Sequence, residues 1–211
     1  MKGSEFMKII YFMRHSETLK LEHIMNNDSL QVQNEKWGLT INGEKIASDK
    51  RKIFELQDFD YVIASNYVRA ISTAKYFTKD KIYVDERFGE RKFGINSWDE
   101  LPENFGEKQF EDFDYKTKDG ESLNEVIKRE LEALKYILNK YTEFNCSKVL
   151  VVGHSTALAA LFSVWCNITK EGYFYKDNLF FDGKWNYCET FKLLFDENNN
   201  LKSIENLKFD I

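Results

Sequence analysis

The sequence has little histidine, proline or cysteine: of its 211 residues, three are histidine, one is proline and three are cysteine. The cysteines Cys146, Cys166 and Cys188 are odd in number and far apart, and the chain has no CxxC pair. Neither a zinc site nor a disulfide framework is therefore predicted. We expect a cytoplasmic protein with reduced thiols and no bound metal.

Long apolar runs are also absent. No run approaches the ~18–20 apolar residues that are needed to span a bilayer. Residues 1–6 (Met-Lys-Gly-Ser-Glu-Phe) lack the apolar stretch of a signal peptide. We interpret them as the remnant of an expression tag before a natural start at Met7. At about 150 residues per domain the length corresponds to roughly 1.4 domains, so residues 7–211 are expected to form a single domain.

Basic residues are outnumbered, 30 against 35, which gives a formal net charge of −5. This balance argues against general binding to nucleic acid or to a membrane surface. The chain is nevertheless rich in core-forming residues, with 18 Phe, 11 Tyr and 4 Trp among its 43% hydrophobic residues. We therefore expect a folded globular protein.

Predicted strands alternate with predicted helices along the chain. The strands are expected at 8–13, 61–64, 81–84, 148–152, 187–195 and 201–209. The helices are expected at about 40–56, 67–77, 122–141 and 156–165, and Ser122 and Glu125 have the spacing of a capping box. This order predicts a three-layer α/β/α sandwich with a mostly parallel central sheet. Residues 88–120 have no clean period and are expected to cross the end of the sheet irregularly, with room for a short helix.

Polar and cationic residues follow three of the predicted strands. Arg14-His15 ends the first strand, Ser65 ends the second with Arg69 one helical turn later, and His154-Ser155 ends the strand at 148–152. Ligands of open α/β sheets bind beyond the carboxyl ends of the strands. Convergence of these ends would gather arginine and imidazole groups, which suit a phosphate group.

Six segments, in the same order along the chain, resemble the signature segments of the histidine phosphatase superfamily, also called the phosphoglycerate mutase-like family. They are 14–18 (Arg-His-Ser-Glu-Thr), 39–43 (Leu-Thr-Ile-Asn-Gly), 64–74, 88–94, 120–122 followed by Arg129, and 149–154. Four positions depart from the family pattern. Ser16 replaces the usual glycine, Ser155-Thr156 replaces the usual glycine pair, and Leu21 stands where many members have asparagine.

The resemblance implies a phosphoglycerate mutase-like fold and a role for each matching residue. His15 would attack phosphorus and form a phosphohistidine, which water would hydrolyse. Arg14, Arg69 and His154 would bind the phosphoryl oxygens, and Glu90 would give a proton to the leaving group. Ser16 and Ser155 would either donate hydroxyl groups to phosphate or only fill space.

Other residues near the first motif are candidates for substrate binding. Glu17 would either orient the arginine and histidine cluster or contact substrate, and Thr18 lies beside it. His23 would either touch substrate or lie in a solvated loop. The aromatic residues at 173–175 and 180–181 would form core, a dimer patch or the rim of the pocket.

The leading functional hypothesis is a phosphatase that acts on a small phosphorylated metabolite without a cofactor. The alternatives are a cofactor-dependent phosphoglycerate mutase, which shares the same catalytic residues, and a non-catalytic phosphoryl-binding protein. No motif names the substrate. A monomer and a homodimer both remain open.

Overall fold

The computed structural model describes residues 6–20, 28–141 and 148–209. Its central sheet has the strand order β3-β2-β4-β1-β8-β9. The strands β1 (Lys8–Arg14), β2 (Tyr61–Ala64), β3 (Ile82–Val84) and β4 (Val149–Gly153) are parallel to their neighbours in this group. The strands β8 (Thr190–Phe195) and β9 (Leu201–Leu207) extend the sheet in antiparallel fashion. The sheet is therefore mixed but mostly parallel, as predicted.

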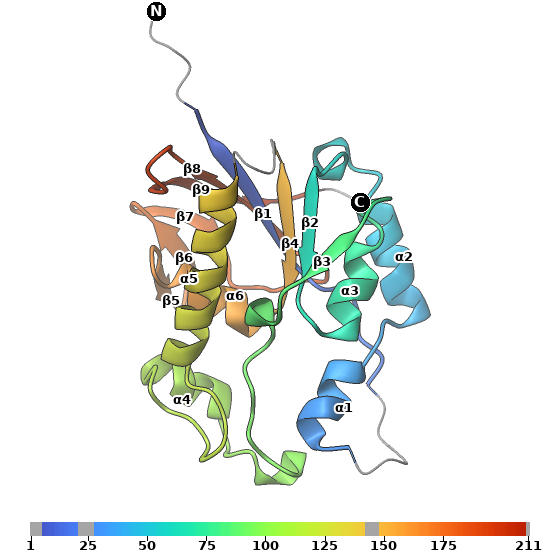
Figure 1. The fold of residues 1–211 in the computed structure, drawn as a ribbon. Helices are drawn as coiled ribbons and strands as arrows, with labels where there is room; N and C mark the ends of the chain where they lie inside the picture. Colours follow the sequence, from blue (N-terminus) through green and yellow to red (C-terminus); the bar gives the residue numbers. More distant parts are fainter. Residues whose placement is uncertain (1–5, 21–27, 142–147, 210–211) are drawn as a thin grey trace, which may run out of the picture.

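Helices cover both faces of this sheet and make the predicted three layers (Figure 1). Helices α2 (Ile41–Lys50) and α3 (Val68–Ala74) pack on one face. Helices α5 (Leu123–Lys140) and α6 (Ser155–Phe162) pack on the other. Ser122 and Glu125 form the predicted capping box at the start of α5, which fixes where this helix begins.

The middle of the sheet is fully apolar. Val149, Leu150, Val151 and Val152 of β4 are each 0% exposed, because helices cover this strand from both sides. A continuous run of such residues is typical of a parallel strand that is buried on both faces. None of the described helices is long and apolar enough to cross a membrane.

A second, smaller sheet follows α6 and was not predicted. It consists of β5 (Asn167–Thr169), β6 (Gly172–Tyr175) and β7 (Asn178–Phe181) in antiparallel order. Lys176 and Asp177 turn between β6 and β7 with positive φ angles of 47° and 64°, as a tight hairpin requires. Tyr173 and Phe181 are buried in the core, which confirms that part of the prediction for the aromatic segments.

The segment expected to be irregular contains short helices. These are η2 (Glu86–Phe88), η3 (Trp98–Glu100) and α4 (Phe105–Glu111). A further helix that was not predicted, α1 (Leu30–Lys36), lies between β1 and α2 in the chain. Figure 1 shows α1 and α4 below the lower edge of the sheet, where the parallel strands have their carboxyl ends. The candidate site lies at this edge.

Candidate active site

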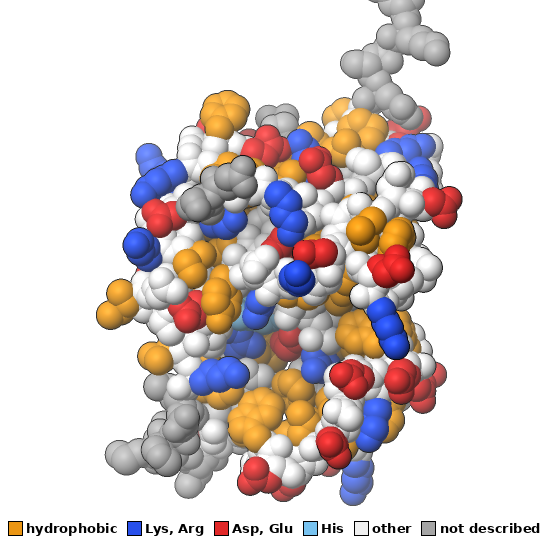
Figure 2. All heavy atoms as spheres, turned by 180° about the vertical axis from the view of Figure 1, so that it is seen from behind, with side chains coloured by type: hydrophobic (Ala, Val, Ile, Leu, Met, Phe, Trp, Pro, Cys, Tyr) orange, Lys and Arg blue, Asp and Glu red, His pale blue; other side chains and the backbone are white. Residues whose placement is uncertain are grey.

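Two histidines meet at the carboxyl ends of β1 and β4. The two strands are neighbours, and the N–H of His15 donates to the carbonyl of Gly153 at 3.0 Å. This bond sets His15 beside His154, the N-cap residue of α6, with the ring centroids 5.1 Å apart. The view from behind shows a histidine side chain deep in a central hollow with Lys and Arg side chains around it (Figure 2). The strand ends therefore converge as the sequence predicted.

The ring of His15 has a defined tautomer. Its Nδ1 lies 2.7 Å from the carbonyl oxygen of Ser16, which can only accept, so Nδ1 carries the hydrogen and Nε2 keeps a lone pair. The hydroxyl of Thr18 makes a longer contact with Nδ1, at 3.3 Å. Burial, followed by the charges of Arg69 and Arg14, holds the pKa of His15 well below its usual value. The imidazole is therefore neutral near pH 7.

Arg69 lies in the first turn of α3 and is 5% exposed. Its Nε donates to Nε2 of His15 at 3.2 Å, and its Nη1 donates to the carbonyl of Asn34 at 2.6 Å. The guanidinium also lies 4.5 Å from the centre of the Tyr67 ring. A guanidinium has five N–H donors, so these contacts leave further donors for an anion.

His154 is fully buried, and its Nε2 lies 2.7 Å from the hydroxyl of Ser65 at the end of β2. The rings of Tyr67 and His154 pack edge to face, with centroids 4.5 Å apart. Burial, followed by the charge of Arg69, lowers the pKa of His154 well below its usual value. Its Nδ1 is buried and has no hydrogen-bond partner in the described part of the chain. Sequence reasoning placed Ser65 at a strand end but did not predict its contact with His154.

Arg14, the last residue of β1, completes the cationic group. Its Nη1 donates to the carbonyl of Trp185 at 2.5 Å, and its guanidinium lies 5.1 Å from the ring centre of Tyr187. Its Nε has no hydrogen-bond partner within the described residues. Residues from three separate strand ends thus supply two guanidinium groups and two neutral imidazoles to one locus.

Glu90 lies in the wall of a hollow of about 370 Å³ that Tyr67 also lines. Its side chain is 12% exposed, and Oε1 accepts a 2.9 Å hydrogen bond from the N–H of Arg91. The Arg91 guanidinium lies 3.7 Å from the same oxygen. The negative charge of Glu90 acts on both Arg14 and Arg69, so its carboxylate lies near the cluster.

Arg129 of α5 holds the segment that carries Glu90. It donates to the backbone carbonyls of Arg87, Gly89 and Glu90 at 2.6, 2.9 and 3.3 Å. Its guanidinium also pairs with the carboxylate of Glu121 through two N–H groups, at 2.9 and 3.0 Å. The segment 120–122 and Arg129 resemble a signature of the family, and the structure shows that Glu121 and Arg129 together fix the backbone around Glu90.

Ser16 points away from the cluster. It is 0% exposed, and its hydroxyl donates to the carbonyl of Gly43 at 2.7 Å. Its N–H donates to the hydroxyl of Thr73 at 2.9 Å. The single hydroxyl proton is therefore used within the fold, and the structure favours packing over phosphate binding for Ser16.

The other predicted residues fall in different places. The carboxylate of Glu17 accepts from Thr40 at 2.9 Å and from Asn42 at 2.6 Å, which ties the loop after β1 to the start of α2. Ser155 is the first residue of α6, where backbone N–H groups are free of helical partners. His23 lies outside the described residues.

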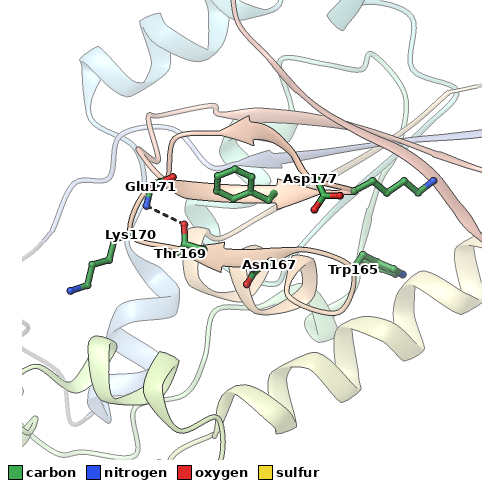
Figure 3. Close-up of a pocket in the computed structure, with 8 residues that line it drawn as sticks. Trp165, Asn167, Thr169, Lys170, Glu171 and Asp177 are labelled. Atoms are coloured by element: carbon green, nitrogen blue, oxygen red, sulfur yellow. Dashed lines mark hydrogen bonds between the residues drawn. The ribbon is translucent and has the colours of Figure 1, made fainter.

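A larger hollow of about 600 Å³ lies elsewhere, beside β5 and β6 (Figure 3). Its lining includes Trp165, Thr169 and Lys170, but no histidine and none of the residues of the cluster. In the part of the chain that the structure describes, no group of three or more His, Cys, Asp or Glu residues could hold a metal ion.

Residues 10–179 match the family model of the histidine phosphatase superfamily (branch 1), and the chain belongs to this superfamily. No curated protein sequence matches the chain. The fold is shared with a mycobacterial glucosyl-3-phosphoglycerate phosphatase (TM-score 0.70, 16% identity, covering 96% of this chain and 100% of that one). It is also shared with a phosphoglycerate mutase from Bacillus anthracis (TM-score 0.69, 19% identity, covering 96% and 93%). At these identities the likeness shows the fold.

Proposed function

We propose that this protein is a phosphatase that hydrolyses small phosphomonoesters through a phosphohistidine on His15, without a metal or cofactor. We further propose that it acts in the cytoplasm, because the free thiols of Cys166 and Cys188 fit a reducing compartment. Membership of the superfamily and the phosphatases among proteins of the same fold support the assignment to this class of enzyme.

The observation that carries the proposal is the fixed state of the His15 ring. A histidine attacks phosphorus only through an unprotonated nitrogen. The Ser16 carbonyl accepts a hydrogen bond from the N–H at Nδ1. Burial and the charges of Arg69 and Arg14 disfavour a second proton on the ring. Nε2 is therefore a lone-pair nitrogen in a cationic setting, as a nucleophile toward a phosphate dianion requires.

In the first step Nε2 of His15 bonds to phosphorus while the bond from phosphorus to the leaving oxygen breaks. Glu90 gives its proton to that oxygen, and the alcohol departs. In the second step Glu90 takes a proton from water, the water oxygen attacks phosphorus, and the N–P bond breaks to release phosphate. Donors from Arg14, Arg69 and His154 would bind the phosphoryl oxygens in both transition states.

The test compares the wild-type protein with His15→Ala on two substrates. A chromogenic aryl phosphate should release phosphate with the wild type, and His15→Ala should abolish the release. The exposed Lys135→Ala on α5 serves as a matched control and should keep full activity. A parallel reaction contains 3-phosphoglycerate with a trace of 2,3-bisphosphoglycerate.

The other outcomes identify the alternatives. Isomerisation of 3-phosphoglycerate without net release of phosphate would make the protein a mutase. Inactivity in both reactions, with phosphate binding retained in calorimetry, would make it a non-catalytic phosphoryl-binding protein.

A further inference from the structure

Two neighbouring hollows lie between α1 and the segment 93–98. Their volumes are about 210 and 490 Å³, and Leu30, Asn96 and Trp98 line both. The smaller hollow also reaches Asn34, and the larger one reaches Trp37. Because the two hollows share these walls, they are neighbours, and we refer to them together as the groove.

The groove begins beside the phosphoryl site. Asn34 lines the smaller hollow, and its carbonyl accepts the 2.6 Å hydrogen bond from Arg69. Gln31 lines the same hollow, and its side chain donates to the Tyr67 hydroxyl at 2.8 Å. A leaving group that extends from a phosphoryl group bound at His15 would therefore reach the groove past Asn34.

Helical spacing explains how α1 contacts both Tyr67 and Arg69 on one side and lines the larger hollow on the other. Gln31 and Asn34 are three residues apart and lie on the stripe that contacts Tyr67 and Arg69. Leu30 and Gln33 lie on the neighbouring stripe, which continues to Trp37 and lines the larger hollow. One short helix thus borders both the residues around His15 and the groove.

The walls of the groove are aromatic. The rings of Trp37 and Trp98 are stacked, with centroids 6.0 Å apart and an interplanar angle of 28°. Phe93 meets Trp98 edge to face at 5.2 Å. Trp98 nevertheless keeps 40% of its surface exposed, although a large apolar ring in a recess would ordinarily be covered. The exposed part of this indole, in a recess with aromatic walls, suits a flat ring that packs against it.

Trp37 adds a polar element. Its side chain is 9% exposed, and its indole N–H is buried without a hydrogen-bond partner in the described part of the chain. Such a buried donor is costly when it stays unpaired. An oxygen atom carried by a bound ring could accept from it.

We propose that Trp37 and Trp98 form a leaving-group subsite that selects phosphate monoesters of alcohols carrying a planar aromatic ring with an oxygen acceptor. This inference rests on the proposed phosphatase function and names the class of substrate for that site. Trp98 supplies the stacking face, and Trp37 supplies both the second ring and the unpaired donor.

The kinetic test uses 2-naphthylmethyl phosphate and n-propyl phosphate, which both release a primary alcohol. Trp98→Ala should raise KM for the naphthyl ester about tenfold, the loss expected when a ring loses its stacking partner, and should leave kcat unchanged. Kinetics with the propyl ester should not change. Trp98→Phe should restore most of the affinity, and Tyr136→Ala, which removes an exposed aromatic side chain on α5, should have no effect. Equal changes for both esters would overturn the subsite.

A binding test separates this inference from the proposed function. Calorimetry on His15→Ala measures the Kd of 2-naphthylmethyl phosphate without turnover, and the added Trp98→Ala should weaken binding about tenfold. A 6-methoxy substituent on the naphthyl ring should strengthen binding unless Trp37 is changed to Phe. Absence of hydrolysis of any ester, with this binding pattern intact, would refute the phosphatase and keep the subsite. A Kd that does not change when Trp98→Ala is added would refute the subsite alone.

Discussion

The Nε of Arg69 donates a hydrogen bond to Nε2 of His15 across 3.2 Å, inside the fold and almost out of contact with solvent. This hydrogen bond identifies Nε2 as the acceptor nitrogen of the ring. The positive charge of Arg69 also disfavours protonation of the imidazole. A phosphoryl group bound at His15 would take over this contact. The guanidinium of Arg69, which now donates to Nε2, would then donate to the phosphoryl oxygens.

Replacing Arg69 with lysine should therefore lower kcat/KM by about 10²–10³, because one point charge cannot replace a planar set of donors in the transition state. Arg51→Lys on the surface beyond α2 is the matched control and should change little. Steady-state kinetics on an aryl phosphate measure the effect. A loss of less than threefold would remove Arg69 from the phosphoryl site.

The pH dependence should report the state of His15. Its pKa lies below the usual 6.5, so protonation should reduce kcat/KM only on the acid side of that value. Removing a neighbouring positive charge with Arg69→Gln lessens the repulsion of the imidazolium and should move the acid limb to higher pH. The measurement is the kcat/KM profile of both proteins on one substrate, so that the ionisation of the substrate cancels. An acid limb that does not move would contradict the electrostatic account.

Glu90→Gln should slow the hydrolysis of alkyl phosphates more than that of aryl phosphates. An aryl leaving group is a weaker base and has less need of a proton in the transition state. Glu86→Gln, which changes an exposed carboxylate in the same hollow, should affect neither substrate. Equal losses on both substrates would remove Glu90 from the role of proton donor.

The buried carboxyl group of Glu130 on α5 should destabilise the folded protein at neutral pH. It has no role in the proposed mechanism. It is 0% exposed, both of its carboxylate oxygens lack a partner within the described residues, and burial raises its pKa to about 8. Between about pH 4.5 and pH 8 the folded protein keeps this group protonated while the unfolded chain ionises it. The unfolded state is therefore favoured, and stability falls as the pH rises through this window.

Glu130→Gln should accordingly raise the free energy of unfolding by about 3 kcal/mol at pH 7, and the gain should vanish near pH 4. The exposed Glu132→Gln on the same helix should have no comparable effect. Urea denaturation at the two pH values measures both variants. A gain that is the same at pH 4 and pH 7 would show that ionisation is not the cause.

The sequence was informative where burial dictates the pattern. The apolar runs of β1 and β4 can be recognised because both faces of each strand meet helices, and a ligand site follows from their carboxyl ends. Helix α1 could not be recognised, since its seven residues are mostly polar and it is held by bonds from Gln31 to Tyr67 and from Arg69 to Asn34. The aromatic segments of β6 and β7 have no clean alternation, because a second sheet buries them unevenly.

The same distinction holds at the site. The convergence of His15, Arg69 and His154 follows from strand order, which sequence spacing can suggest. The bond between Ser65 and His154 and the orientation of Ser16 toward Gly43 depend on side-chain rotamers. Such details are set by packing in three dimensions, and no spacing along the chain encodes them.

The most direct test of the account is to trap the phosphoenzyme. The wild-type protein is mixed with a phosphate ester, quenched in alkali to preserve an acid-labile phosphohistidine, and mapped by peptide mass spectrometry. We expect one phosphoryl group on His15 that disappears on mild acid treatment and is absent from His15→Ala. Full turnover without any phosphoryl group on His15, or with the group on another residue, would contradict the mechanism.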